Sequence, residues 1–375
     1  MQTICYLTID ELTILKDNND TQHILTHGRR LEMSKYLLGG KGQFYKANLH
    51  CHTDLSDGYL TPEEVKALYK AHGYSIVAFT DHDILIPHKD LKDDSFLPLN
   101  GLEFTLISPA EEAGLPGKHP TIHLCMIGLE EDNVTMPLYH REKYIKYHPE
   151  TVRPLLTVDE TLPNYERGFE VRDINEVITT ARSRGFFVTY NHPGWSHDDP
   201  RRILSYEGLN ALEVYNSLFV RLGYDDCNQY LYDAMLRAGQ RVLPIAADDN
   251  HNKYPLGHKL CNTFCAWTQI EAENLEYRCV TKALEEGSYY ISTGPAIHSL
   301  RIDGDRLIIE CSPVARILVT YDTERVQRKD ADGDGITSAS FKLQPNGGWF
   351  RVTVYDQNGS FAMTRAYYPK EYMKP

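Results

Sequence analysis

The chain has 375 residues, of which 42% are hydrophobic and 24% are charged, and its formal net charge is −13. This composition is typical of a folded globular protein and excludes a mainly disordered or fibrous chain, and the length indicates about two domains. Because the net charge is negative, we do not expect the protein to bind duplex nucleic acid.

We expect a cytoplasmic protein with no membrane partner. No apolar run approaches the ~18 residues that a membrane-spanning helix needs. The N-terminal residues lack the basic start and apolar stretch of a secretion signal. The 8 cysteines are scattered and form no CxxC pair, so we interpret them as reduced core residues.

The chain begins with a short region of mixed pattern and then changes to β–α units. Residues 1–43 end in a glycine-rich segment and predict an N-terminal extension. From residue 44 onward, apolar runs alternate with helical stretches, which favours a parallel sheet. The clearest unit has a strand at 44–52 and a helix over 61–73, which Thr61 begins and Glu64 completes as a capping box.

Further strands and helices continue this pattern as far as residue 294. Strands are predicted at about 74–83, 97–103, 122–128, 186–190, 209–215 and 241–246. Helices are predicted at about 173–184, 226–239 and 274–286. The pattern then changes to alternating strands with Asp-Gly and Asn-Gly turns, so residues 295–375 predict an antiparallel β-sandwich-like domain.

Histidines and carboxylates cluster where the predicted strands end. His50 and His52 alternate across Cys51, so both imidazoles point to the same side of the first strand. In a parallel barrel, residues at the carboxyl ends of different strands meet at one rim. Each of them alone is more typical of a turn or a cap, but the convergence of the whole set favours a metal site. The other candidate ligands are Asp57, His82, Glu103, His123, His192, Asp249 and His251.

These residues lie in phrases that resemble a known family. The phrases NLHCHTDLSDG, TPEEV, GYSIVAFTDHD, GLEFT, NHPGW and DDNH resemble the PHP (polymerase and histidinol phosphatase) family, and specifically its two-domain metal-dependent phosphoesterase branch. The matches cover about 45–295 in the family's order. The resemblance implies an α/β fold with a distorted (β/α)7 barrel and a trinuclear metal site.

The resemblance also implies a ligand set for each metal. His50, His52, Glu103 and Asp249 would hold the first metal, Glu103, His123 and His192 the second, and Asp57, His82 and His251 the third. The residues expected to carry catalysis are Asp57, His82, Glu103, His192 and Asp249. Asp248 is an alternative to Asp249, which we favour because it keeps the family's Asp-x-His spacing with His251.

The expected reaction follows from this chemistry. Histidine and carboxylate ligands suit Mn, Zn or Fe, and metals ~3.5–4 Å apart lower the pKa of a bridging water and stabilise a leaving oxygen. We therefore expect two to three divalent metals and hydrolysis of a small phosphomonoester, or of a diester or nucleotide, by a metal-activated hydroxide. The general acid stays open among four residues: Asp81, Asp83, His197 and His258.

Two other functions compete with this interpretation. The first is an amidohydrolase-like enzyme that cleaves a C–N or C–O bond, because an HxH strand also opens those barrels. A strand-end lysine would be expected there, and Glu103 takes that role here. The second is a non-catalytic glycan-binding or protein-binding protein, which a complete ligand set opposes. The sequence does not predict the substrate or the oligomeric state.

Overall fold

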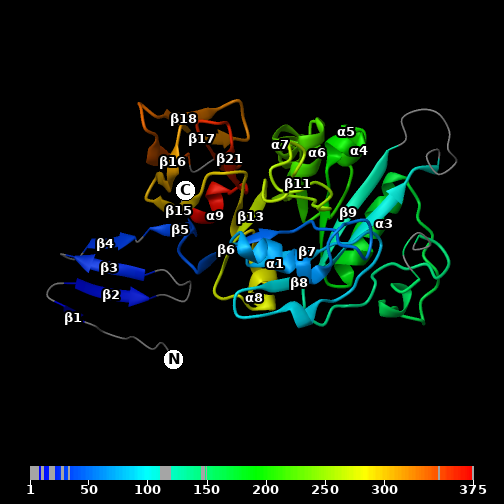
Figure 1. Cartoon of the computed structure of the whole chain (residues 1–375). Coiled ribbons are helices and arrows are strands. Elements are labelled where there is room, and N and C mark those ends of the chain that lie inside the picture. Colours follow the sequence, from blue (N-terminus) through cyan, green and yellow to red (C-terminus); the bar gives the residue numbers. More distant parts are fainter. Residues whose placement is uncertain are drawn as a thin grey trace. The chain divides into compact units, whose positions relative to one another are not determined.

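The computed structural model describes residues 8–9, 12–16, 22–26, 29–32, 34–109, 120–144, 148, 150–344 and 347–373, with side chains described from residue 34 onward. The chain forms two compact units (Figure 1). The larger unit comprises Gly42–Gly294 and Ser360–Arg365, and the smaller comprises Met1–Lys41, Pro295–Gly359 and Ala366–Pro375. Within the described ranges, no helix is long and apolar enough to cross a membrane.

The larger unit is an α/β structure built on a mixed sheet. Its strands pair in the order β12-β11-β10-β9-β8-β7-β6-β13-β14-β21. The seven strands from β6 to β12 correspond to the seven that the sequence predicts. Their bounds are β6 (Gln43–Asn48), β7 (Ile76–Phe79), β8 (Leu97–Ile107), β9 (Thr121–Gly128), β10 (Phe186–Tyr190), β11 (Ala211–Asn216) and β12 (Leu243–Ala247). Three strands were not predicted: β13 (Trp267–Ala272), β14 (Tyr289–Ser292) and β21 (Phe361–Thr364).

The expectation that all of these strands are parallel is wrong at β9. β6, β7 and β8 run parallel, as do β10, β11 and β12, but β9 is antiparallel to both β8 and β10. The register places Ile107, the last residue of β8, opposite Thr121, the first residue of β9. The chain therefore returns directly onto the neighbouring strand, as in a hairpin, instead of crossing over to run parallel.

The four predicted helices are present, and capping explains where the first one begins. They are α1 (Pro62–Ala71), α3 (Val171–Ser183), α7 (Gln229–Arg237) and α8 (Tyr277–Glu286). At α1, the Thr61 side chain accepts a hydrogen bond from the backbone of Glu64, whose carboxylate accepts one from the backbone of Thr61. Among the described residues of the larger unit, three short α-helices were not predicted: α4 (Pro193–Ser196), α5 (Pro200–Ile203) and α6 (Ser217–Leu222).

Alternation along β6 and the residues after it separates the core from the site. Ala47, Leu49 and Cys51 are buried in apolar clusters. Because successive side chains of an extended chain point to opposite faces, His50 and His52 turn away from these clusters. Both imidazoles are nonetheless buried, so they lie in a polar interior on the other side of the strand.

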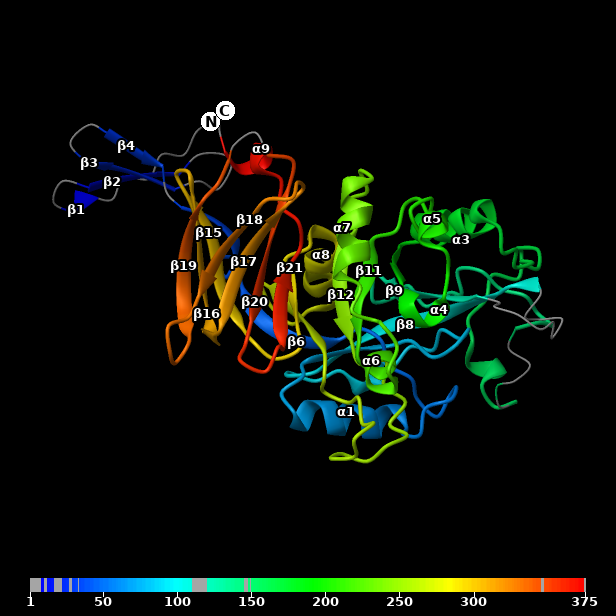
Figure 2. The same cartoon turned by 90° about the horizontal axis from the view of Figure 1, so that it is seen from above.

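The smaller unit is antiparallel, as predicted for residues 295–375, and Figure 2 shows its strands side by side. One sheet has the order β19-β16-β15-β5, and β20, β17 and β18 pair in that order. The bounds are β5 (Lys35–Leu38), β15 (Ile297–Asp303), β16 (Arg306–Val314), β17 (Arg316–Tyr321), β18 (Val326–Asp330), β19 (Ile336–Lys342) and β20 (Phe350–Tyr355). A short helix, α9 (Pro369–Tyr372), follows near the C-terminus. The strands β1 (Thr8–Ile9), β2 (Leu12–Lys16), β3 (Gln22–Thr26) and β4 (Arg29–Glu32) form a separate antiparallel sheet.

Two segments pair outside the regions to which the sequence assigned them. β5 lies in the expected N-terminal extension but pairs with β15 of the smaller unit. β21 lies in the expected C-terminal domain but pairs with β14 of the larger unit. Each has only four residues, and such a short strand carries little local signal of which partner it joins.

Candidate metal centre

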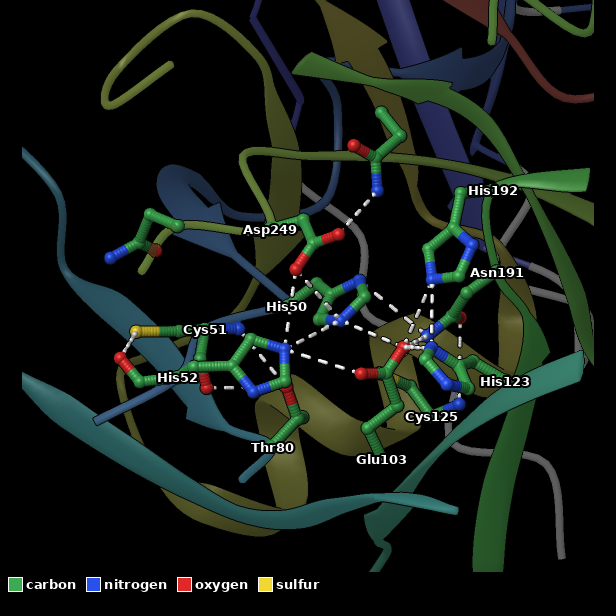
Figure 3. Close-up of polar contacts among 12 residues, drawn as sticks. His50, Cys51, His52, Thr80, Glu103, His123, Cys125, Asn191, His192 and Asp249 are labelled. Atoms are coloured by element: carbon green, nitrogen blue, oxygen red, sulfur yellow. Dashed lines mark hydrogen bonds and ion pairs between the residues drawn. The ribbon is translucent and has the colours of Figure 1, made fainter. Parts of the chain in front are cut away.

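The structure brings all of the predicted ligands together. Each of them belongs to at least one group of three or more side chains whose ligand atoms lie within 4.8 Å of one another. The groups are His52, Asp57, His82 and His251; His50, His192 and Asp249; His50, Glu103 and Cys125; and His82, Glu103 and His123. Figure 3 shows the inner part of this constellation.

Glu103 on β8 lies at the middle of the constellation. Its carboxylate is buried, with Oε1 3.1 Å from a nitrogen of His50, His123 and His192, and Oε2 3.2 Å from a nitrogen of His52 and His82. Burial by itself would raise the pKa of Glu103, but the charges of His123 and His50 bring it well below its ordinary value. The five imidazoles that Glu103 faces therefore favour its anionic form.

His123 reaches the same place because β9 is antiparallel. It is near the start of β9, so it lies at the edge where the parallel neighbours end. Its Nδ1 is 3.2 Å from Nε2 of His192. In a parallel β9, the same residue would lie at the opposite edge of the sheet, away from the other ligands.

Asp249, and not Asp248, faces the histidines. Its Oδ1 is 3.3 Å from Nε2 of His50 and 3.2 Å from Nε2 of His52. Asp248 instead accepts hydrogen bonds from the Tyr69 hydroxyl at 2.9 Å and from the backbone N–H of Phe264 at 2.7 Å. Burial raises the pKa of Asp248 to about 6. Its carboxylate anchors the loop after β12, which leaves Asp249 to face the centre.

Asp57 forms the open side of the centre. Its side chain is 53% exposed, and Oδ2 lies 3.2 Å from Nε2 of His251 and 3.7 Å from Nε2 of His82. His52 links this group to the inner one, because its Nδ1 is 3.5 Å from Asp57 and its Nε2 is 3.2 Å from Glu103. The resemblance implies that His52 binds the first metal only, whereas the structure places its ring between Glu103 and Asp57.

Three residues that the sequence analysis did not select position the ligands. The Glu213 carboxylate on β11 is 3.1 Å from Nδ1 of His50 and accepts the backbone N–H of His192 at 2.9 Å. The Asn216 amide donates to Glu213 at 2.8 Å and to Asp249 at 3.0 Å. Asn191 donates to Glu103 at 2.9 Å. A carboxylate within the apolar run ALEVYN was the available signal for Glu213.

The donor set fits a cation. Among the described residues, buried atoms without a hydrogen-bond partner include Nδ1 of His52, His82 and His192 and Oδ1 of Asp249. Burial lowers the pKa of His50, but the Asp249 and Glu103 carboxylates raise it well above its ordinary value, so positive charge is favoured between these two anions. Burial lowers the pKa of His82 to about 3, which keeps its imidazole neutral and able to donate a lone pair to a metal.

The four candidates for the general acid lie outside these groups of described side chains. Asp81 accepts hydrogen bonds from the backbone and the hydroxyl of Thr53, at 2.7 and 2.8 Å. Asp83 accepts from Arg167 at 2.7 Å. Both carboxylates therefore hold loops in place. The His258 ring stacks on Tyr254 at 4.7 Å, and His197 has a left-handed backbone conformation with φ of 51°.

Comparisons with known proteins give matches among solved structures only. No family model matches the chain, and no curated protein matches it. The chain is similar to a two-domain protein from Bacteroides vulgatus that contains a predicted PHP-like metal-dependent phosphoesterase, with 15% identity, coverage of 90% of this chain and 99% of that one, and a TM-score of 0.44. A proposed metal-dependent phosphoesterase from Bifidobacterium adolescentis shares 15% identity over 58% of this chain and 91% of its own, with a TM-score of 0.36. An amidohydrolase from Chromobacterium violaceum with bound sulfate shares 17% identity over 56% and 90%, with a TM-score of 0.36.

Proposed function

We propose that the protein is a metal-dependent phosphoesterase of the PHP family that hydrolyses a small phosphomonoester. A phosphodiester or a nucleotide is the second class of ester that the same chemistry would accept. The observation that carries the proposal is Glu103, a buried carboxylate within 3.2 Å of five imidazole nitrogens. An anion in this position is well placed to be shared by two cations.

Two to three divalent ions of Mn, Zn or Fe would occupy the centre. Glu103 would be shared between two inner positions, one completed by His50, His52 and Asp249 and the other by His123 and His192. Asp57, His82 and His251 would form the outer position. Such ions supply an activated water and stabilise the charge on phosphoryl oxygens. A substrate would enter at the exposed side of the centre, beside Asp57. The buried carboxylate of Glu213 would orient the ligands, and that of Asp248 would hold the loop after β12 in place.

A distorted (β/α)7 barrel is part of the proposal. The seven strands from β6 to β12 would form it, with β9 reversed. Its closure is supported by a parallel bridge between Cys51, after β6, and Asn250, after β12. The backbone N–H of His52 donates to the Asn250 carbonyl at 3.0 Å, beside the same bridge. A cytoplasmic location and the lack of duplex nucleic-acid and membrane partners stay predictions of the sequence.

The test is hydrolysis of an aryl phosphate by protein that has been stripped of metal with a chelator and then supplied with Mn²⁺. We expect no turnover after stripping and recovery with Mn²⁺. The variant Glu286→Gln, which changes an exposed carboxylate on α8, is the matched control for Glu103→Gln and should keep the activity. Cleavage of an aryl ester or amide without cleavage of any phosphate ester would contradict the proposal and favour an amidohydrolase-like enzyme. If the aryl phosphate is hydrolysed, a panel of phosphorylated metabolites would define the substrate.

A further inference from the structure

Cys125 lies within the candidate metal centre. Its side chain on β9 is buried, and its sulfur forms a group with ligand atoms of His50 and Glu103, all within 4.8 Å of one another. The sequence predicts that this cysteine is a reduced core residue, and the resemblance assigns no role to its thiol. Its position therefore raises the question of whether it is core packing or part of the site.

The strand pattern directs the thiol toward the ligands. His123 and Cys125 are two residues apart on β9, so their side chains point to the same face. Cys125 is also the direct cross-strand partner of Glu103 on β8. The thiol thus belongs to the same row of side chains as two of the proposed ligands.

Asn191 holds both the thiol and the shared carboxylate. Its Oδ1 accepts the backbone N–H of Cys125 at 3.4 Å, and its Nδ2 donates to Sγ of Cys125 at 2.9 Å. The same Nδ2 donates to Oε1 of Glu103 at 2.9 Å (Figure 3). The two amide hydrogens therefore serve one carboxylate and one sulfur, so a single side chain fixes the positions of both.

A second, independent feature points to a cation at this place. Oδ1 of Asp249 is buried and makes no hydrogen bond among the described residues, although it lies 3.3 Å from Nε2 of His50 and 3.2 Å from Nε2 of His52. An unpartnered buried carboxylate oxygen is costly unless a cation or a donor satisfies it. Its direction toward His50 marks the same imidazole that Cys125 and Glu103 approach.

We propose that Cys125 is a metal ligand, together with His50 and Glu103, and that its sulfur makes this position selective for a thiophilic ion such as Zn²⁺ over Mn²⁺. On binding, the thiol releases its proton to solvent and the resulting thiolate forms the sulfur–metal bond. Soft sulfur ligands favour Zn²⁺ over the harder Mn²⁺. This inference rests on the metal centre proposed above but does not depend on which ester is hydrolysed.

Cobalt substitution of the full-length protein tests the proposal without reference to activity. Stripped protein loaded with Co²⁺ should show a sulfur-to-cobalt charge-transfer band in the near ultraviolet, and Cys125→Ser should lack it. Cys311→Ser is the matched control, because Cys311 is buried to the same degree, 2% exposed, but lies on β16 of the smaller unit. This control should keep the band.

Metal affinity and X-ray absorption test the role of Cys125 independently of the charge-transfer band. Cys125→Ser should weaken Zn²⁺ binding by about 10-fold or more, as expected for removal of a ligand, and weaken Mn²⁺ binding less. If this variant does not fold, zinc-edge X-ray absorption of the wild-type protein replaces it, with a sulfur scatterer expected at about 2.3 Å. Cobalt binding without a charge-transfer band, or a zinc site with only nitrogen and oxygen scatterers, would overturn the role of Cys125 and leave the centre intact. Protein that binds neither Co²⁺ nor Zn²⁺ would overturn the centre itself.

Discussion

At the scale of single residues, charge and hydrogen bonding separate ligands from supports. Glu103 and Asp249 present oxygens to imidazole nitrogens. Glu213, which is just as buried, contacts His50 only at Nδ1, on the far side of the ring, and also accepts the backbone N–H of His192. Asp248 contacts none of these imidazoles and accepts hydrogen bonds from Tyr69 and the backbone of Phe264. Carboxylates of the same type in one interior therefore have different roles, and each role can be tested by an isosteric amide.

Glu103→Gln keeps the size of the side chain and removes the shared negative charge. We expect at least a ~100-fold loss of turnover and weaker binding at both inner positions, because even the loss of a residue that only hydrogen-bonds to a metal ligand costs about 10–100-fold. Asp57→Asn should weaken the outer position and disturb the inner ones less. Elemental analysis and turnover of both variants check this. Full metal content with near wild-type turnover in Glu103→Gln would mean that Glu103 is not shared.

Glu213→Gln tests the support behind His50. The carboxylate lies 3.1 Å from Nδ1 of His50, on the side of the ring away from Glu103. Such a partner orients a ligating imidazole and raises its basicity, so its loss should weaken metal binding by about 10–100-fold. Titration with Zn²⁺ measures the affinity, and Glu286→Gln serves as the surface control. An unchanged affinity would show that Glu213 only fills space.

At the scale of elements, the loop after β6 holds Asp57 over the strand end. The backbone N–H of Gly58 donates to the Thr53 carbonyl at 2.8 Å. A Cβ at Gly58 would lie 2.6 Å from the carbonyl oxygen of His52. This close approach of two backbones explains why the loop needs a glycine there.

Gly58→Ala should therefore displace the loop and its carboxylate. We expect loss of the outer metal while the inner positions stay filled, because Glu103, His192 and Asp249 come from other elements. Metal stoichiometry measures this. Gly347→Ala is the matched control, since a Cβ there would meet its nearest atom at 3.4 Å. Equal metal content in both variants would mean that the loop adapts to the extra methyl group.

At the scale of the whole molecule, the candidate metal centre brings together many segments in the interior of the larger unit. The proposed ligands come from β8, β9 and from segments that follow β6, β7, β10 and β12, which are far apart in the sequence. A cation that binds only when these strands are assembled stabilises the folded state by linkage. Without it, Oδ1 of Asp249 and one ring nitrogen of several buried histidines make no hydrogen bond among the described residues.

Removal of metal should accordingly lower thermal stability. At a free metal concentration 100 times its Kd, one site contributes about 2.7 kcal/mol. We expect a chelator to lower the Tm and excess Mn²⁺ or Zn²⁺ to restore it, and differential scanning calorimetry measures both. The size of the shift should fall in Glu103→Gln. A Tm that is independent of chelator and metal would argue that no cation occupies the interior.

The sequence alone determined what depends on neighbouring residues. The capping box at Thr61 and Glu64, the strand segments and the alternation of His50 with His52 are set within a few residues, so each could be predicted, and strand ends then suggested which side chains would meet. Tertiary structure decided the rest. The reversal of β9, which brings His123 and Cys125 to the centre, and the partners of β5 and β21 depend on pairing between distant segments. The role of Glu213 likewise arises only when β11 lies beside the ligands, because a buried carboxylate gains its function from the atoms that surround it.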